Sequence, residues 1–190
     1  MQELRGPGKP IDCSAPRLYS PAMKTRGIAL ALLFVLILAA LGQFFYFFGD
    51  LPSRVATRYD AYGQPELTLH KAAFAAFYLG IIVFFSVYGI VARYYAHKLP
   101  DRYLKIIPSH AHWLAPENRP ATVAWVSGAL VWVAVLTLAL FAATFTLIML
   151  SNTGQPVSSM STTLGFLNTI YLTALFLLVM GFRKRFHLKQ

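Results

Sequence analysis

The sequence predicts an all-α integral membrane protein, a four-helix bundle with both termini in the cytoplasm. From Pro120 to Phe182 the chain runs 63 residues without Asp, Glu, Lys, Arg or His. A soluble domain of this size needs charge on its surface, so such a stretch fits two membrane crossings and a short link. Two further uncharged runs, 27–48 and 72–92, come earlier in the chain. In addition, Lys and Arg are frequent in every second segment outside these runs and scarce in the segments between.

Four apolar segments are long enough to cross a hydrocarbon core of about 30 Å, which needs about 20 residues. They are expected at residues 27–48, 72–92, 121–150 and 164–182. The third is too long for an upright crossing, so we expect it to tilt or to project into the headgroups through residues 121–125.

Two terminal segments lie outside the predicted membrane domain of residues 27–182. Residues 1–26 are expected to form a flexible basic tail, because residues 1–20 contain three prolines, two glycines and scattered charge. Residues 183–190 form a second, short basic tail.

The distribution of charge predicts the orientation. Fourteen of the 17 Lys and Arg residues lie in segments 1–26, 93–120 and 183–190, and the loops 49–71 and 151–163 hold three and none. Basic residues favour the cytoplasmic side of a membrane, which places both termini and segment 93–120 there. This surface would attract anionic lipid headgroups. Membrane topology thus explains the net charge of +10, and no motif that reads nucleic acid is present, so nucleic acid is not an expected partner.

The loop 49–71 is the most patterned polar segment, and we expect a helix-turn cap over the outer end of the bundle. Asp50 could cap a short helix that begins at Leu51-Pro52, with Leu51, Val55 and Tyr59 on one apolar face. Gly63 and Pro65 would end it. Thr68 or His70 would then lead into the second span.

Small residues recur four apart in two of the predicted spans. The second span carries Ala72, Ala76 and Gly80. The fourth carries Gly165, Thr169 and Thr173, with Gly181 two turns later. Small residues at this spacing let helices approach closely in lipid. Packing within the bundle is the favoured interpretation, and a seam between two copies of the chain is the alternative.

The spans contain polar but no ionisable side chains. Gln43, Asn168 and several threonines (Thr137, Thr144, Thr146, Thr169 and Thr173) are expected to bond across helices rather than to bind a substrate. Transport of an uncharged solute is the alternative that these groups leave open.

No catalytic, cofactor-binding or metal-binding signature is found. His110 and His112 form an isolated His-x-His pair, which lacks a third ligand. The acidic residues of the outer loop and His70 have no spacing that favours a hydrolase or a cation site. The sequence therefore predicts no enzyme, cofactor or metal.

The outer loop resembles the bacterial membrane family called domain of unknown function 1648, whose loose pattern is L-P-x-x-[IV]-P-x-H-[FY]-[DN]-x-x-G-x-P with a lysine entering the next span. The matching residues are Leu51, Pro52, Val55, Tyr59, Asp60, Gly63, Pro65 and Lys71. The chain has Ala56 and Arg58 where the family usually has proline and histidine. The segment 113–119, which contains Trp113, Pro116, Glu117 and Arg119, is similar to a Y-W-L-A-P-E-x-R segment of stand-alone members.

The resemblance implies a small multi-pass protein of the bacterial plasma membrane with no assigned enzymatic activity. The domain also occurs in relatives of Sdp-type bacteriocin-immunity and signalling proteins. We therefore expect a non-enzymatic role in immunity, sensing or as an accessory protein, with loop 49–71 binding a protein or peptide partner. A small transporter or channel for neutral or lipophilic solutes is the alternative function, and a homo-oligomer is a further expectation.

Overall fold

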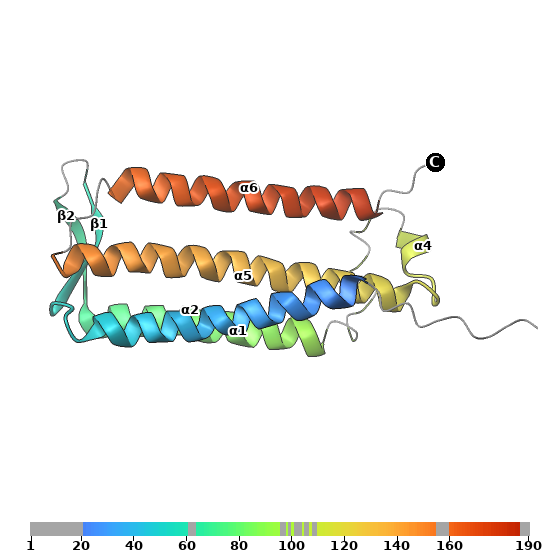
Figure 1. The fold of residues 1–190 in the computed structure, drawn as a ribbon, viewed down its shortest axis with the longest axis horizontal. Helices are drawn as coiled ribbons and strands as arrows, with labels where there is room; N and C mark the ends of the chain where they lie inside the picture. Colours follow the sequence, from blue (N-terminus) through green and yellow to red (C-terminus); the bar gives the residue numbers. More distant parts are fainter. Residues whose placement is uncertain are drawn as a thin grey trace, which may run out of the picture.

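A computed structural model describes residues 21–60, 64–95, 98, 100, 104, 107, 110–154 and 160–186 of the chain. These residues form the helices α1 (Pro21–Phe48), α2 (Lys71–Tyr94), α4 (His110–Trp113), α5 (Arg119–Asn152) and α6 (Met160–Phe186). The strands β1 (Arg54–Tyr59) and β2 (Pro65–His70) lie between α1 and α2. The long helices run side by side, with β1 and β2 at one end of the bundle and the first turn of α1 and the last turn of α6 at the other (Figure 1). We call these the hairpin end and the termini end.

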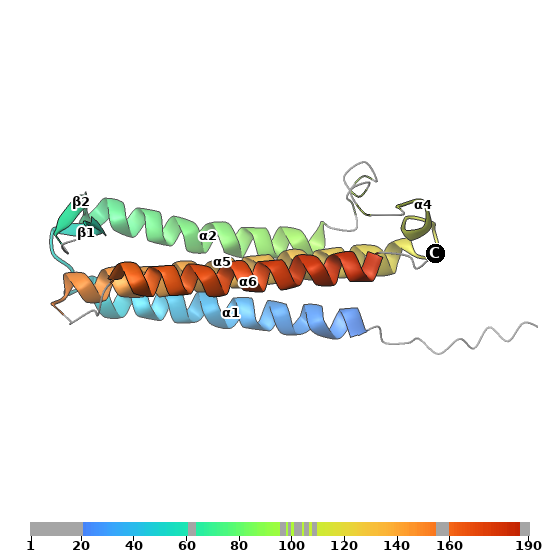
Figure 2. The ribbon, with the colours of Figure 1, turned by 90° about the horizontal axis from the view of Figure 1, so that it is seen from above.

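Helix α5 is the centre of the bundle. Helices α1 and α2 both lie on one side of α5, next to each other, and α6 lies on the opposite side (Figures 1 and 2). Buried residues of α5 pack with α1 and α2 from Val131 near the middle of the helix to Met149 near the hairpin end. Helix α6 packs mainly against α5, and Phe186 is its buried residue. The fourth helix is therefore the least enclosed.

All four long helices are long and apolar enough to cross a membrane. Their outward faces carry large apolar side chains, for example Phe34, Phe84 and Phe176, which are each more than 60% exposed. Water is a poor solvent for such faces, and lipid is a suitable one. The prediction of an all-α, four-helix membrane bundle is confirmed.

Two of the helices extend into segments that were predicted to be terminal tails. Helix α1 begins at Pro21, inside the segment expected to be a flexible tail, and α6 continues to Phe186, inside the expected basic tail. Proline suits a first helical turn because its missing N–H would have no partner there. Helix α5 has 34 residues, about 51 Å at 1.5 Å per residue. It thus exceeds the membrane core, as its apolar run predicts.

The core near the hairpin end is rich in aromatic rings. Phe145 of α5 contacts Phe74 and Tyr78 of α2, with ring centroids 5.4 and 4.5 Å apart. Tyr78 also stacks on Phe44 of α1 at 5.6 Å. All four rings are buried. Because they come from three helices, this cluster holds α1, α2 and α5 together directly beneath the hairpin.

Candidate functional site: the outer hairpin

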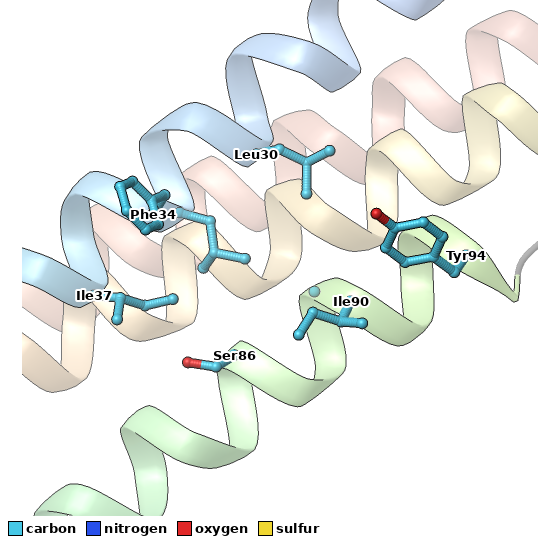
Figure 3. A pocket seen from close by; sticks show the side chains of 8 residues that line it. Leu30, Phe34, Ile37, Ser86, Ile90 and Tyr94 are labelled. Atoms are coloured by element: carbon cyan, nitrogen blue, oxygen red, sulfur yellow. The ribbon is translucent and has the colours of Figure 1, made fainter.

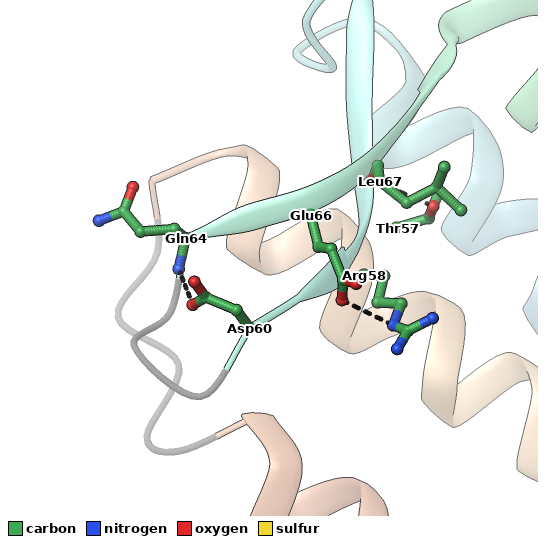
Figure 4. A network of polar contacts seen from close by, with 6 residues as sticks. All are labelled: Thr57, Arg58, Asp60, Gln64, Glu66 and Leu67. Atoms are coloured by element: carbon green, nitrogen blue, oxygen red, sulfur yellow. Dashed lines mark hydrogen bonds and ion pairs between the residues drawn. The ribbon is translucent and has the colours of Figure 1, made fainter.

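The segment between α1 and α2 is an antiparallel β-hairpin, so the predicted helix-turn cap is wrong. Strand β1 pairs with β2 from Arg54 opposite His70 to Tyr59 opposite Pro65. The backbone N–H of Asp60 donates to the carbonyl of Gln64 at 2.9 Å, and the N–H of Gln64 donates to Asp60 Oδ1 at 2.8 Å (Figure 4). These bonds close the hairpin loop. The predicted helix-breaking role of Gly63 lies outside the described residues.

The helix prediction failed because the apolar residues are spaced by four. Leu51, Val55 and Tyr59 share a face both in a helix and in a strand, since four is close to one helical turn and is also twice the strand period. Val55, Thr57 and Tyr59 are β-branched or aromatic, which favours a strand. Asp50 caps no helix; its N–H bonds to the carbonyl of Phe47 at 3.1 Å, at the end of α1.

Asn152 at the end of α5 attaches the hairpin to the bundle. Its Oδ1 accepts from the N–H of Ala56 at 2.8 Å, and its Nδ2 donates to the carbonyl of Ala56 at 2.9 Å. Nδ2 also lies 3.2 Å from the Tyr59 hydroxyl and 2.7 Å from the carbonyl of Ile148. The amide thereby takes the place of a neighbouring strand at the edge of β1. No sequence pattern marks Asn152 as a residue that holds the hairpin.

Lys71 and His70 fix the other side of the hairpin. Lys71 Nζ donates to the carbonyls of Leu51 at 2.9 Å and Gly49 at 3.3 Å, and it lies 4.6 Å from the ring centre of Phe48. The backbone N–H of Lys71 donates to the carbonyl of Ser53 at 2.9 Å. His70 is the N-cap of α2, with its Nδ1 accepting from the N–H of Ala72 at 3.3 Å. The expectation that Thr68 or His70 leads into the second span is confirmed for His70.

The motif residues of this segment thus divide into two groups. Leu51 is buried, while Tyr59 and Lys71 are partly buried and bonded, so these three hold the hairpin to the helices. Pro52, Asp60 and Pro65 are exposed. Pro65 is the first residue of β2, a position where its missing N–H is tolerated.

Strand β2 presents most of its side chains outward. Its residues Pro65 to Thr68 and His70 are exposed, and Leu67 is 52% exposed although it is apolar. Arg58 Nε and Glu66 Oε2 form an ion pair at 2.8 Å across the strands, with both side chains at least half exposed (Figure 4). An exposed pair of this kind adds little to stability. The exposed side chains of the hairpin therefore include a cation, a carboxylate and an apolar side chain.

The second motif segment lies at the opposite end, where it holds the end of α6. Trp113 Nε1 donates to the carbonyl of Phe186 at 3.2 Å, and the Thr122 hydroxyl donates to the carbonyl of Trp113 at 2.9 Å. The rings of Trp113 and Trp125 each meet Phe186 edge-on. Pro116 and Glu117 are exposed, and Arg119 is the first residue of α5. The structure does not bring this segment near the hairpin motif (Figure 1).

Some polar side chains within the spans join helices, and most of these bonds lie near the hairpin end. Gln43 of α1 donates from Nε2 to Thr146 Oγ1 at 2.7 Å and to the carbonyl of Ala142 at 3.3 Å on α5. The Tyr78 hydroxyl donates to the carbonyl of Ala40 at 3.0 Å. Thr137 bonds to the Tyr171 hydroxyl at 3.1 Å, which joins α5 to α6. The predicted cross-helix bonding is confirmed for Gln43, Thr137 and Thr146.

The same prediction is wrong for Asn168, Thr169 and Thr173. All three are exposed on α6, and their side chains donate to carbonyls of the preceding turn of that helix. The predicted packing of small residues inside the bundle is also wrong, because the residues of both stripes are exposed. These are Ala72, Ala76, Gly80, Gly165, Thr169, Thr173 and Gly181. The alternative, a seam between two copies, stays a prediction.

Within the described part of the chain, no three His, Cys, Asp or Glu residues are grouped so that they could hold a metal ion. His112 is exposed, and the side chain of His110 lies outside the described residues.

No protein-family model, curated protein or solved structure matches the chain. The resemblance of residues 51–71 and 113–119 to the domain of unknown function 1648 rests on the motif residues alone and stays a prediction.

Proposed function

We propose that this chain is a non-enzymatic, multi-pass protein of the bacterial plasma membrane whose hairpin binds a protein or peptide partner outside the cytoplasm. The observation that carries the proposal is that residues 49–71 contain one set of side chains that attaches the hairpin and another set that is exposed. Leu51, Tyr59 and Lys71 are committed to attaching the hairpin, whereas β2 keeps its side chains exposed. Exposed side chains on a segment that is held in place at three residues suit the binding of a partner.

The charge distribution supports the orientation in this proposal. Segments 1–26, 93–120 and 183–190 of the sequence hold fourteen of the 17 basic residues, and segment 49–71 holds three basic and three acidic residues. The positive-inside rule then places the termini in the cytoplasm and the hairpin outside. An immunity, sensing or accessory role suits a protein whose exposed feature is a rigid recognition element.

A transporter for neutral solutes has less support. Gln43, one of its two expected polar residues, is engaged in bonds between α1 and α5. Asn168, the other, lies exposed on α6 and bonds to the carbonyl of Leu164 at 2.9 Å. Since α6 packs mainly against α5, these two amides do not line a common path between helices. We therefore prefer the hairpin as the functional element.

Photocrosslinking from the hairpin tests the proposal. A benzophenone amino acid in place of Leu67 should give a discrete protein adduct in intact cells, because that side chain is 52% exposed. The same group in place of Phe176, which is 62% exposed on α6, is the matched control and should give no protein adduct of that mass. The readout is an immunoblot, with the adduct identified by mass spectrometry.

A second variant separates recognition from chance proximity. Replacing both Arg58 and Glu66 by alanine should reduce the adduct from position 67 several-fold while the amount of membrane-inserted protein stays the same, because their exposed ion pair contributes little to stability. An identical adduct at positions 67 and 176, or an adduct unchanged by the double replacement, would reject the hairpin as a binding element.

A further inference from the structure

An apolar groove runs between α1 and α2 in the half of the bundle nearer the termini end. It has a volume of about 430 Å³, within the range of about 300–1,000 Å³ typical of ligand sites. Leu30, Phe34 and Ile37 of α1 face Ser86, Ile90 and Tyr94 of α2 across it (Figure 3). Phe34, Ile90 and Tyr94 are more than half exposed. The groove therefore opens sideways, and the ribbons of α5 and α6 lie behind it (Figure 3).

The groove offers dispersion contacts rather than hydrogen bonds. The hydroxyl of Ser86 donates to the carbonyl of Ile82 at 2.7 Å, so its proton is used within α2. Gly89 lies directly against α1, because a Cβ there would collide with the side chain of Leu33. Glycine at this position lets Leu33 rest against the backbone of α2. Apart from Ser86 and Tyr94 the lining is apolar, so a polar solute would find little to replace its lost water in such a groove.

The length of the groove and its position along the helices fit one leaflet of the membrane. Leu30 to Ile37 on α1 and Ser86 to Tyr94 on α2 cover about 10–12 Å along the helix axes. Half of the hydrocarbon core is about 15 Å thick. The groove thus spans most of the leaflet at the termini end and ends near the middle of the first span, residues 27–48.

The ends of the two helices carry charge of one sign. Lys24 and Arg26 stand in the first turns of α1, Arg93 stands in the last turn of α2, and Lys98 follows it. Segments 21–26 and 93–98 contain no acidic residue. Each basic residue near the headgroups adds about 1 kcal/mol of attraction for anionic lipid. A molecule whose tail fills the groove would place a negatively charged headgroup beside these positions.

We propose that this groove holds an acyl chain of an anionic phospholipid from the leaflet at the termini end. The occupant follows from three features: apolar walls open to lipid, a length that matches one leaflet, and a purely basic pair of helix ends above it. The proposal does not depend on the role of the hairpin.

Native mass spectrometry of the full-length, delipidated protein in detergent tests the proposal. Dioleoyl phosphatidylglycerol should remain bound at one molecule per chain, and phosphatidylcholine with the same tails should be retained about tenfold less, which corresponds to about 1.4 kcal/mol. Ser86→Phe should fill the groove and reduce phosphatidylglycerol retention about tenfold. Val87→Phe adds the same ring to the neighbouring residue, which is 53% exposed and does not line the groove, and should leave retention unchanged.

If Ser86→Phe lowers the melting temperature relative to Val87→Phe, Ser86→Leu is the second groove variant. Leucine is smaller than phenylalanine and suits a helix. Equal retention by the groove variants and Val87→Phe would overturn the proposal, as would equal retention of the two lipids. Loss of a dimer in the groove variants with unchanged lipid retention would show that a second copy occupies the groove and would also overturn it.

Discussion

Phe145→Ala should destabilise the bundle by about 3 kcal/mol, the lower end of the range of about 3–5 kcal/mol for removing a buried phenylalanine. Phe145 is 4% exposed and touches the rings of Phe74 and Tyr78, so its loss leaves a cavity where α2 meets α5. We expect the lower end because lipid tails are as apolar as the core. The lost packing contacts remain costly, whereas the water-transfer part of the cost is small.

The matched control is Phe176→Ala, which removes the same ring from the exposed face of α6. Its expected effect is below about 0.5 kcal/mol, as for most exposed positions. Unfolding of both variants in mixed micelles of increasing denaturing-detergent fraction, followed by loss of helical circular dichroism, gives the two free energies. Equal losses for Phe145→Ala and Phe176→Ala would mean that the aromatic cluster does not hold the helices together.

Asn152→Leu should release the hairpin without unfolding the helices. The change removes the amide that bonds both backbone groups of Ala56 and the Tyr59 hydroxyl. Buried backbone groups left without partners cost about 1–3 kcal/mol each, and we expect a local loss of about 2 kcal/mol because water can reach part of this edge. Amide hydrogen exchange in residues 54–60 and 64–70 should therefore accelerate, while exchange in the middle of α5 stays slow.

Two further variants sharpen this result. Asn168→Leu removes an exposed amide that bonds to the carbonyl of Leu164 one turn earlier, and it should leave hairpin exchange unchanged. Asn152→Asp keeps an oxygen that accepts from the N–H of Ala56 but loses the N–H donor to the carbonyl of Ala56. Amide exchange of the hairpin in this variant should therefore be faster than in the wild type and slower than in Asn152→Leu. Hairpin exchange that is as slow in Asn152→Leu as in the wild type would refute the role of Asn152.

The sequence predicts the four spans well because a membrane helix needs a long apolar run, which is a local property. A helix is predicted in place of the hairpin because the spacing of Leu51, Val55 and Tyr59 fits both the helical period and the strand period. Its attachment has no local signal at all: Asn152 contacts Ala56 across 96 residues of sequence. A lone asparagine at a helix end is expected to cap that helix, and nothing in the pattern marks it as the partner of a strand.

The prediction that the small-residue stripes pack inside the bundle is wrong for a different physical reason. In water, the apolar face of a helix reveals which side is buried, but in lipid both sides are apolar. The spacing of Ala72, Ala76 and Gly80 therefore allows close approach without saying which face turns inward, and all three are exposed. Gly89, which the stripe does not include, is the glycine against which Leu33 packs. The groove beside it could be found from the arrangement of α1 and α2 and not from the sequence.

The central claim is that four helices cross a bilayer with the hairpin and the termini on opposite sides. Cys13 is the only cysteine in the chain, so it reports on the amino terminus without any substitution. A Thr68→Cys variant in a Cys13→Ser background carries its single thiol on the exposed strand β2 and reports on the hairpin. A membrane-impermeant maleimide should label this hairpin variant in intact cells, and it should label Cys13 of the wild type only after the membrane is permeabilised. Labelling of Cys13 in intact cells, or labelling of both thiols from the same side, would contradict the four-span account.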